Sequence, residues 1–321
     1  MTRSLVLLTV LALGCTEKPG RLVVFDGYGT PAELVLAGRL LEDRPRTATS
    51  SSARRRDNLM ASWDALESDE IAGAQVRLTI EGREFEATTD ADGRFQVSAK
   101  CGDRPFPLGV LPIVADVLAP EKHPTRPAGA LAYVYGPGPG VLIISDLDDT
   151  LVDTRVRERS AMVSNTLLVN ALQAGLIAGA PAVYRRAIEA GAGGVFYVSG
   201  SPHSLHDRLA LFLSHHQLPR GPILLKNFGE DAIFAQDDYK LARIRKLLDM
   251  FPGHRFLLVG DNGERDPEIY AKIRTERPER IAGIVIRRAP NGDASAARAA
   301  DMIVVDDYAA DEGLLQRIIA P

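Results

Sequence analysis

A group of polar residues that could do chemistry follows a short apolar run near the middle of the chain. Asp146, Asp148, Asp149 and Thr150 come directly after Val141–Ser145. A continuous apolar run that ends abruptly in acid predicts a buried parallel strand, and ligands bind just beyond the carboxyl ends of such strands. Three carboxylates so close together repel one another unless a cation or a phosphoryl group makes use of them. This strand end is therefore the candidate centre of a site.

Further polar residues are expected at the same edge of the sheet. Ser199 and Gly200 follow one apolar run, and Asp261 follows another, with Asp266 close behind it. Lys240 stands at the start of a predicted helix that precedes the second of these runs. Because the carboxyl ends of parallel strands meet at one edge, these distant positions are expected to lie together.

The combination suits phosphoryl transfer. A carboxylate can attack phosphorus and form an aspartyl phosphate, and a second acid two residues further on points the same way and can protonate the leaving oxygen. Mg²⁺ offsets the repulsion between carboxylates and phosphate, and a hydroxyl and a lysine can bind the phosphoryl oxygens. Each signal alone has an ordinary alternative: Asp-x-Asp also occurs in turns and calcium loops, Ser199 fits a strand-end hydroxyl, and Lys240 fits a solvated helix. The four in this order indicate one site.

The second half of the chain alternates between strands and helices. Strands are expected at 141–144, 195–198, 223–225, 256–259, 284–286 and 302–305, and helices at 167–177, 182–190, 204–214, 241–250 and 267–276. This rhythm predicts an α/β domain over residues 141–321, with a parallel sheet flanked by helices.

The first half has a different pattern. Residues 74–80, 83–89 and 94–97 alternate in the manner of half-buried strands separated by turns, which predicts a small antiparallel β-sandwich over residues 20–120. The Pro- and Gly-dense residues 121–140 are expected to form a linker.

Residues 1–15 resemble a bacterial lipoprotein signal peptide. Arg3 precedes the apolar run Leu5–Leu13, which is too short to span a bilayer, and Leu11-Ala-Leu-Gly-Cys15 is similar to a lipobox. The resemblance implies cleavage before Cys15 and its acylation, which would anchor the chain to a membrane and leave Cys101 unpaired. Thr16, where an aspartate would retain such a protein at the inner membrane, favours the outer membrane. The alternative is a plain secretory signal.

The bulk composition is that of a globular protein. A length of 321 residues favours about two domains, and 45% apolar with 25% charged residues supplies a sizeable core. The net charge of −4 gives no sign of nucleic-acid binding.

The motifs around the acidic strand end resemble those of the haloacid-dehalogenase superfamily of phosphohydrolases, and more narrowly the actin-patch-protein-type phosphatidate phosphatases. The stretches that carry the resemblance are Gly27-Tyr-Gly-Thr30, Ser145-Asp-Leu-Asp-Asp-Thr150, Tyr197-Val-Ser-Gly-Ser-Pro202 and Gly260–Tyr270, which ends in Asp266-Pro-Glu-Ile-Tyr270. The chain departs from the family at Gly200, His203 and Asn262. These positions are expected at the rim of the pocket, where they bear on substrate choice.

The resemblance implies a role for each matching residue. The catalytic residues would be Asp146 as nucleophile, Asp148 as general acid and base, and Lys240 as the group that stabilises the phosphorylated intermediate. The substrate-binding residues would be Thr150, which supports the loop, with Ser199 and Gly200 at the phosphate. A haloacid-dehalogenase-like Mg²⁺ site would be formed by Asp146, the backbone carbonyl of Asp148, Asp261 and Asp266. Asp149 is expected to shape the loop rather than react.

These observations lead to one hypothesis and two alternatives. The hypothesis is a Mg²⁺-dependent phosphatase of the bacterial cell envelope, lipid-anchored and facing the periplasm, which converts a phosphatidate-like lipid into diacylglycerol and phosphate. Too few residues separate Thr150 from Ser199 for a large cap domain, so an open site is expected to admit a bulky substrate. The first alternative is a phosphatase of soluble periplasmic phosphomonoesters. The second, less favoured because no catalytic position is broken, is a non-catalytic surface lipoprotein.

Overall fold

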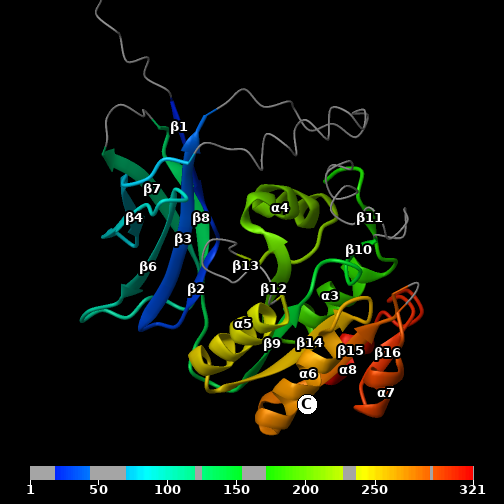
Figure 1. The fold of residues 1–321 in the computed structure, drawn as a ribbon. Helices are drawn as coiled ribbons and strands as arrows, with labels where there is room; N and C mark the ends of the chain where they lie inside the picture. The colour runs from blue at the N-terminus through cyan, green and yellow to red at the C-terminus, as the bar shows by residue number, and fades with distance from the viewer. Residues whose placement is uncertain are drawn as a thin grey trace, which may run out of the picture.

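The computed structural model describes residues 19–43, 70–119, 125–153, 171–226, 236–289 and 292–320. These residues form a mixed α/β structure with two main sheets, one in each half of the chain (Figure 1). The predicted signal peptide, Cys15 and the predicted cleavage site lie outside the described residues.

The sheet of the second half has six strands, all parallel, in the order β13-β12-β9-β14-β15-β16. Their bounds are β9 Gly140–Ser145, β12 Ala192–Pro202, β13 Ile223–Lys226, β14 His254–Asp261, β15 Ile281–Arg287 and β16 Ile303–Val305. The middle strands are apolar and buried on both faces, which is why they read as continuous apolar runs. The predicted parallel sheet is confirmed.

Helices cover both faces of this sheet. One face carries α3 Ala180–Glu189, α4 His206–His215 and α8 Leu314–Ile319, whose buried residues share one core with the sheet. The other face carries α5 Gln236–Met250, α6 Asp266–Glu276 and α7 Ser295–Ala299, around a second core. Two short 3₁₀ turns, η3 His203–Leu205 and η4 Pro278–Arg280, precede α4 and follow α6.

One predicted helix is wrong in its described part. Residues 167–177 were expected to be helical, but Gly175–Leu176 forms β11, which pairs antiparallel with β10 Val152–Asp153. The apolar residues there have helical spacing, but the backbone of this segment pairs with the strand that follows the acidic loop.

The first half forms a single eight-stranded sheet. Seven strands follow the order β1-β3-β2-β8-β7-β4-β5, and β6 pairs with β3. Their bounds are β1 Gly20–Val24, β2 Gly27–Gly29, β3 Glu33–Glu42, β4 Gln75–Ile80, β5 Arg83–Thr88, β6 Arg94–Lys100, β7 Gly109–Ala119 and β8 Ala128–Val134. All neighbours are antiparallel except β2 and β8, which are parallel. The sheet curls around one apolar core, so that β5 and β6 meet. The finer classification as a β-sandwich stays a prediction.

The linker prediction is wrong for part of its length. Residues 128–134 lie within the predicted linker 121–140, but they form β8 in the interior of the sheet, between β2 and β7. The prolines on both sides of this segment favoured a linker in the sequence analysis, although the segment is a strand whose alternate residues Ala130, Ala132 and Val134 are buried.

The two sheets are joined by an aromatic junction. The ring of Tyr28 in β2 meets Phe196 of β12 edge-on at 5.4 Å, and Tyr135, just after β8, lies 5.5 Å from the same ring. Arg220 donates two hydrogen bonds to Asp26, at 2.8 and 2.9 Å. None of the helices in the described part of the chain has the length and apolar character needed to cross a membrane.

Candidate active site

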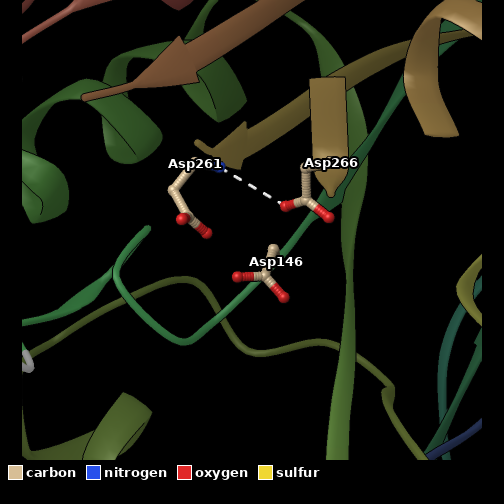
Figure 2. A group of neighbouring side chains, drawn as sticks. All are labelled: Asp146, Asp261 and Asp266. Atoms are coloured by element: carbon tan, nitrogen blue, oxygen red, sulfur yellow. Dashed lines mark hydrogen bonds between the residues drawn. The ribbon is translucent and has the colours of Figure 1, made fainter. Parts of the chain in front are cut away.

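Three buried aspartates converge at the carboxyl edge of the parallel sheet. Asp146 follows β9, Asp261 ends β14, and Asp266 begins α6, and their side chains point toward one another in Figure 2. Strands β9 and β14 are hydrogen-bonded neighbours, and the Asp146 amide donates to the carbonyl of Val259 at 2.9 Å. One carboxylate oxygen from each aspartate lies within 4.8 Å of those of the other two.

Lys240 is the cation of this cluster. Its Nζ lies 2.8 Å from Asp146 Oδ1, 2.8 Å from Asp266 Oδ1 and 3.2 Å from Glu264 Oε2. The lysine side chain is almost wholly buried, at 3% exposure. Its ammonium group therefore lies inside the site and not in solvent. The solvated-helix alternative for Lys240 is therefore wrong.

The electrostatics show an excess of negative charge. Burial raises the pKa of Asp146 well above its ordinary value, although Lys240 opposes the rise. Burial and the neighbouring Asp266 raise the pKa of Asp261 to about 8, and burial also raises the pKa of Asp266. Burial alone would lower the pKa of Lys240, but the surrounding carboxylates, Asp146 first, raise it well above its ordinary value. One lysine does not neutralise this many carboxylates.

Thr150 and Asp149 shape the loop between β9 and β10. Thr150 Oγ1 lies 3.2 Å from Asp146 Oδ2 and 3.4 Å from Asp261 Oδ2. Asp149 has a left-handed backbone with φ of 53°, a conformation that aspartate tolerates better than most residues. The buried Arg287, at the end of β15, donates to the Asp149 carbonyl at 2.9 Å. Arg287 was not predicted as a site residue. Its position directly after an apolar run is the feature of the sequence that could have indicated it, but its contact with Asp149 joins residues far apart in the chain.

Asp148 is held by two serines from the end of β12. Ser199 Oγ and Ser201 Oγ donate to Asp148 Oδ2 at 3.1 and 3.0 Å, and the Ser201 amide donates to Ser199 Oγ at 3.0 Å. Burial raises the pKa of Asp148, Glu264 adds to the rise, and the two serine hydrogen bonds oppose it. Gly200 lies between the two serines in β12 and is half-buried. Ser201 was not expected at the site, although it stands in the same motif.

The carboxylate cluster fits a Mg²⁺ ion. Mg²⁺ takes oxygen ligands in an octahedron at about 2.0–2.1 Å, so ligand oxygens on opposite sides of the ion lie roughly 4 Å apart, close to the spread of the three aspartates. Asp261 Oδ1 is also fixed by the Gly263 amide at 2.5 Å. The absence of a side chain at Gly260 is required, because a Cβ there would lie 2.4 Å from Asp266 Oδ2. Asp146, Asp261 and Asp266 are therefore the residues that would hold the ion.

The fold and the cluster define the second half as an α/β domain with a carboxylate–lysine site at the carboxyl edge of its sheet. Residues 141–288 match the family described as "Phosphatidate phosphatase APP1, catalytic domain". This match covers the α/β domain and less than half of the chain, and it confirms the resemblance to the actin-patch-protein-type enzymes.

The chain is also similar to two curated proteins from yeasts. It is 32% identical over 213 residues to the phosphatidate phosphatase APP1 of Saccharomyces cerevisiae, covering 64% of this chain and 35% of that protein. It is 36% identical over 156 residues to an uncharacterized protein of Schizosaccharomyces pombe, covering 46% of this chain and 25% of that protein. The chain thus spans about a third or less of the length of these relatives. The solved structure of a carbohydrate acetylesterase from Xanthomonas citri matches at 12% identity over 94% of this chain and 74% of that one. Its TM-score of 0.28 is too low to indicate a shared fold.

Proposed function

We propose that this chain is a Mg²⁺-dependent phosphomonoesterase that hydrolyses a phosphatidate-like lipid to diacylglycerol and phosphate through an aspartyl-phosphate intermediate. The observation that carries the proposal is the environment of Asp146. Its carboxylate lies between Lys240 and Thr150, in the same buried cluster as Asp261 and Asp266. A desolvated carboxylate fixed at both oxygens is oriented for attack, which lowers the entropic part of the barrier.

In the first half-reaction an oxygen of Asp146 forms a bond to phosphorus, and the bond from phosphorus to the glyceryl oxygen breaks. The leaving oxygen takes a proton from Asp148, whose raised pKa favours the protonated form that this step requires. Ser199 and Ser201 hold the carboxyl of Asp148 in place for the transfer. Diacylglycerol then leaves as a neutral alcohol.

In the second half-reaction Asp148, now ionised, takes a proton from a water molecule that attacks the phosphorus of the aspartyl phosphate. The bond between phosphorus and Asp146 breaks, which regenerates the carboxylate and releases inorganic phosphate. Lys240 is placed to bind negative charge that develops on the phosphoryl oxygens, and Ser199 and Gly200 would contribute to phosphate binding. The Mg²⁺ ion, when bound, neutralises part of the combined charge of phosphate and carboxylates.

The lipid part of the proposal rests on the family and on the N-terminus. The yeast relative is named a phosphatidate phosphatase, and residues 1–15 have the pattern of a lipoprotein signal peptide. Acylation of Cys15 would hold the enzyme at a membrane of the cell envelope, where a phosphatidate-like substrate resides. The proposed location is the outer membrane, with the catalytic domain in the periplasm.

Phosphate release from a substrate panel tests this function. The purified protein should release phosphate from phosphatidate in mixed micelles when Mg²⁺ is present, and Asp146→Asn should abolish the release. Asp149→Asn is the matched control: it changes an aspartate three residues away, asparagine tolerates the left-handed backbone, and the carbonyl that binds Arg287 remains. Activity that survives in Asp146→Asn would refute the mechanism, and preference for small soluble phosphomonoesters would refute the lipid substrate.

A further inference from the structure

Exposed apolar side chains gather on one strand of the N-terminal sheet. The described residues include six large hydrophobic side chains that are exposed: Leu108, Val110, Val114, Leu118, Leu211 and Ile303. Four of the six lie at or just before strand β7, between residues 108 and 118, and their exposed fractions run from 62% at Leu108 to 38% at Leu118. Single exposed apolar residues are common on proteins, but a row of them on one strand is not explained by folding alone.

The row follows from the alternation of β7. Leu111, Ile113 and Ala115 point into the core of the sheet and are buried, so the residues between them point outward. Pro112 is also exposed on this outward side. We call Leu108, Val110, Pro112, Val114 and Leu118 the apolar row. Because β7 lies between β8 and β4, the row sits in the interior of the sheet face and not on an edge that another strand could extend.

The apolar row continues an interface that is already formed. Val110 is directly opposite Tyr133 on β8, and opposed residues of an antiparallel pair point to the same face. Tyr133 packs against the core that β12 and α5 share, on the side of the sheet that meets the catalytic domain. The apolar row therefore lies, at Val110, next to the part of the sheet that the catalytic domain covers.

We propose that the apolar row docks on an anionic lipid surface and sets the enzyme against the membrane that holds its substrate. This inference rests on the proposed function, since it assumes a substrate embedded in lipid. No charged residue occurs between Arg104 and Asp116, and Asp116 is paired with Arg77 at 3.7 Å. Exposed arginines lie beyond both ends of β7: Arg126 before β8, and Arg104, which is 68% exposed and lies 3.7 Å from Glu81. Apolar side chains flanked by arginines match a bilayer interface with anionic headgroups.

Chain length and area favour a lipid surface over a second copy of the chain. Strand β1 begins at Gly20, five residues after Cys15, and five extended residues span about 17 Å, so an acylated Cys15 would keep the sheet close to the bilayer. A stable dimer buries about 800 Å² per partner, which a row one strand wide does not supply. Shallow insertion of a few side chains, added to a lipid anchor, needs no such area.

Sedimentation with vesicles tests the inference. The protein is the chain from Thr16 to Pro321, which retains every described residue and lacks the predicted anchor. The vesicles contain phosphatidylcholine and phosphatidate in a four-to-one ratio. Val110→Thr with Val114→Thr replaces two outward methyl groups by hydroxyls of nearly the same shape and should weaken partitioning on the order of tenfold. Ile303→Thr changes a β-branched residue that is 40% exposed in the other half of the chain, and it should leave partitioning unchanged.

Wild-type protein that does not bind the vesicles, or a double variant that binds as well as wild type, would overturn the proposal. Loss of a dimer in the double variant by analytical ultracentrifugation would also overturn it, in favour of a second copy. Hydrolysis of a water-soluble, short-chain phosphatidate is measured in parallel: it should be equal in all variants, and its absence in wild type would refute the proposed function without deciding vesicle binding. If the double variant unfolds, Leu108→Asn, which lies outside β7, takes its place with the same outcomes.

Discussion

The charge of the aspartate cluster makes a definite prediction about stability and pH. Burial and Asp266 raise the pKa of Asp261 to about 8, whereas an aspartate in the unfolded chain has a pKa of about 3.9. The folded protein therefore binds more protons than the unfolded chain between these two values. Since stability rises with pH only where the unfolded state binds more protons, the contribution of Asp261 to the free energy of unfolding must fall as pH rises from about 4 to about 8.

The magnitude follows from the same two pKa values. Protonation of Asp261 stabilises the fold by about 2.7 kcal/mol at pH 6 and by about 0.4 kcal/mol at pH 8. In metal-free protein the Asp261 contribution should thus fall by about 2 kcal/mol between these pH values. Asp146 and Asp266 act in the same direction, since burial raises the pKa of both. Mg²⁺ should abolish most of the loss, because a bound cation keeps the carboxylates ionised.

Urea unfolding at pH 6 and pH 8, in the presence of a chelator and again with Mg²⁺, measures the effect. Asp261→Asn is the control, because asparagine keeps an oxygen for the Gly263 amide but does not titrate. This variant should lose clearly less stability than wild type between the two pH values. Metal-free wild type that is as stable at pH 8 as at pH 6, or a control with the full wild-type loss, would refute the electrostatic reasoning.

Three further substitutions test other contacts of the site. Lys240→Met should destabilise the metal-free fold by about 3–5 kcal/mol, because it leaves buried carboxylates without their cation, and should abolish phosphate release; both are measured on one preparation. Gly260→Ala places a Cβ 2.4 Å from Asp266 Oδ2 and should weaken Mg²⁺ binding, measured by titration calorimetry. Ser201→Ala removes a hydrogen bond that lowers the pKa of Asp148, so the alkaline limb of the kcat/KM profile should move to higher pH.

The parallel sheet could be predicted from the sequence because its strands are buried on both faces. All six apolar runs of the second half became strands of one sheet. The two errors arose where local pattern competed with long-range pairing. The segment 128–134 looked like part of a Pro-rich linker, yet it is stabilised by pairing with β2 and β7 from far away in the chain. Residues 175–176 have a helix-compatible context, but they pair with β10.

The candidate site was predictable in its membership and less so in its contacts. Strand-end position placed Asp146 and Asp261 together, and the start of a predicted helix added Lys240; the structure brings all three together. The two hydrogen bonds to Asp148 depend on how the end of β12 bends, since its register with β13 shifts between Ser199 and Pro202. No periodicity in a single sequence encodes such a shift, which is why the second serine was missed.

The arrangement of charges also links stability to catalysis. Lys240 contacts Asp146, the proposed nucleophile, and Asp266, which begins α6, and both of these carboxylates also belong to the candidate Mg²⁺ site. The lysine and a bound cation therefore neutralise the same negative charge, and removal of either leaves the same buried excess. Because β9 and β14 are adjacent strands, this excess cannot be relieved by a local movement of one loop without breaking the centre of the sheet. Carboxylates held so closely are stabilised at neutral pH by protons or by a cation besides Lys240, and in the proposed mechanism a bound Mg²⁺ would leave Asp146 ionised for attack.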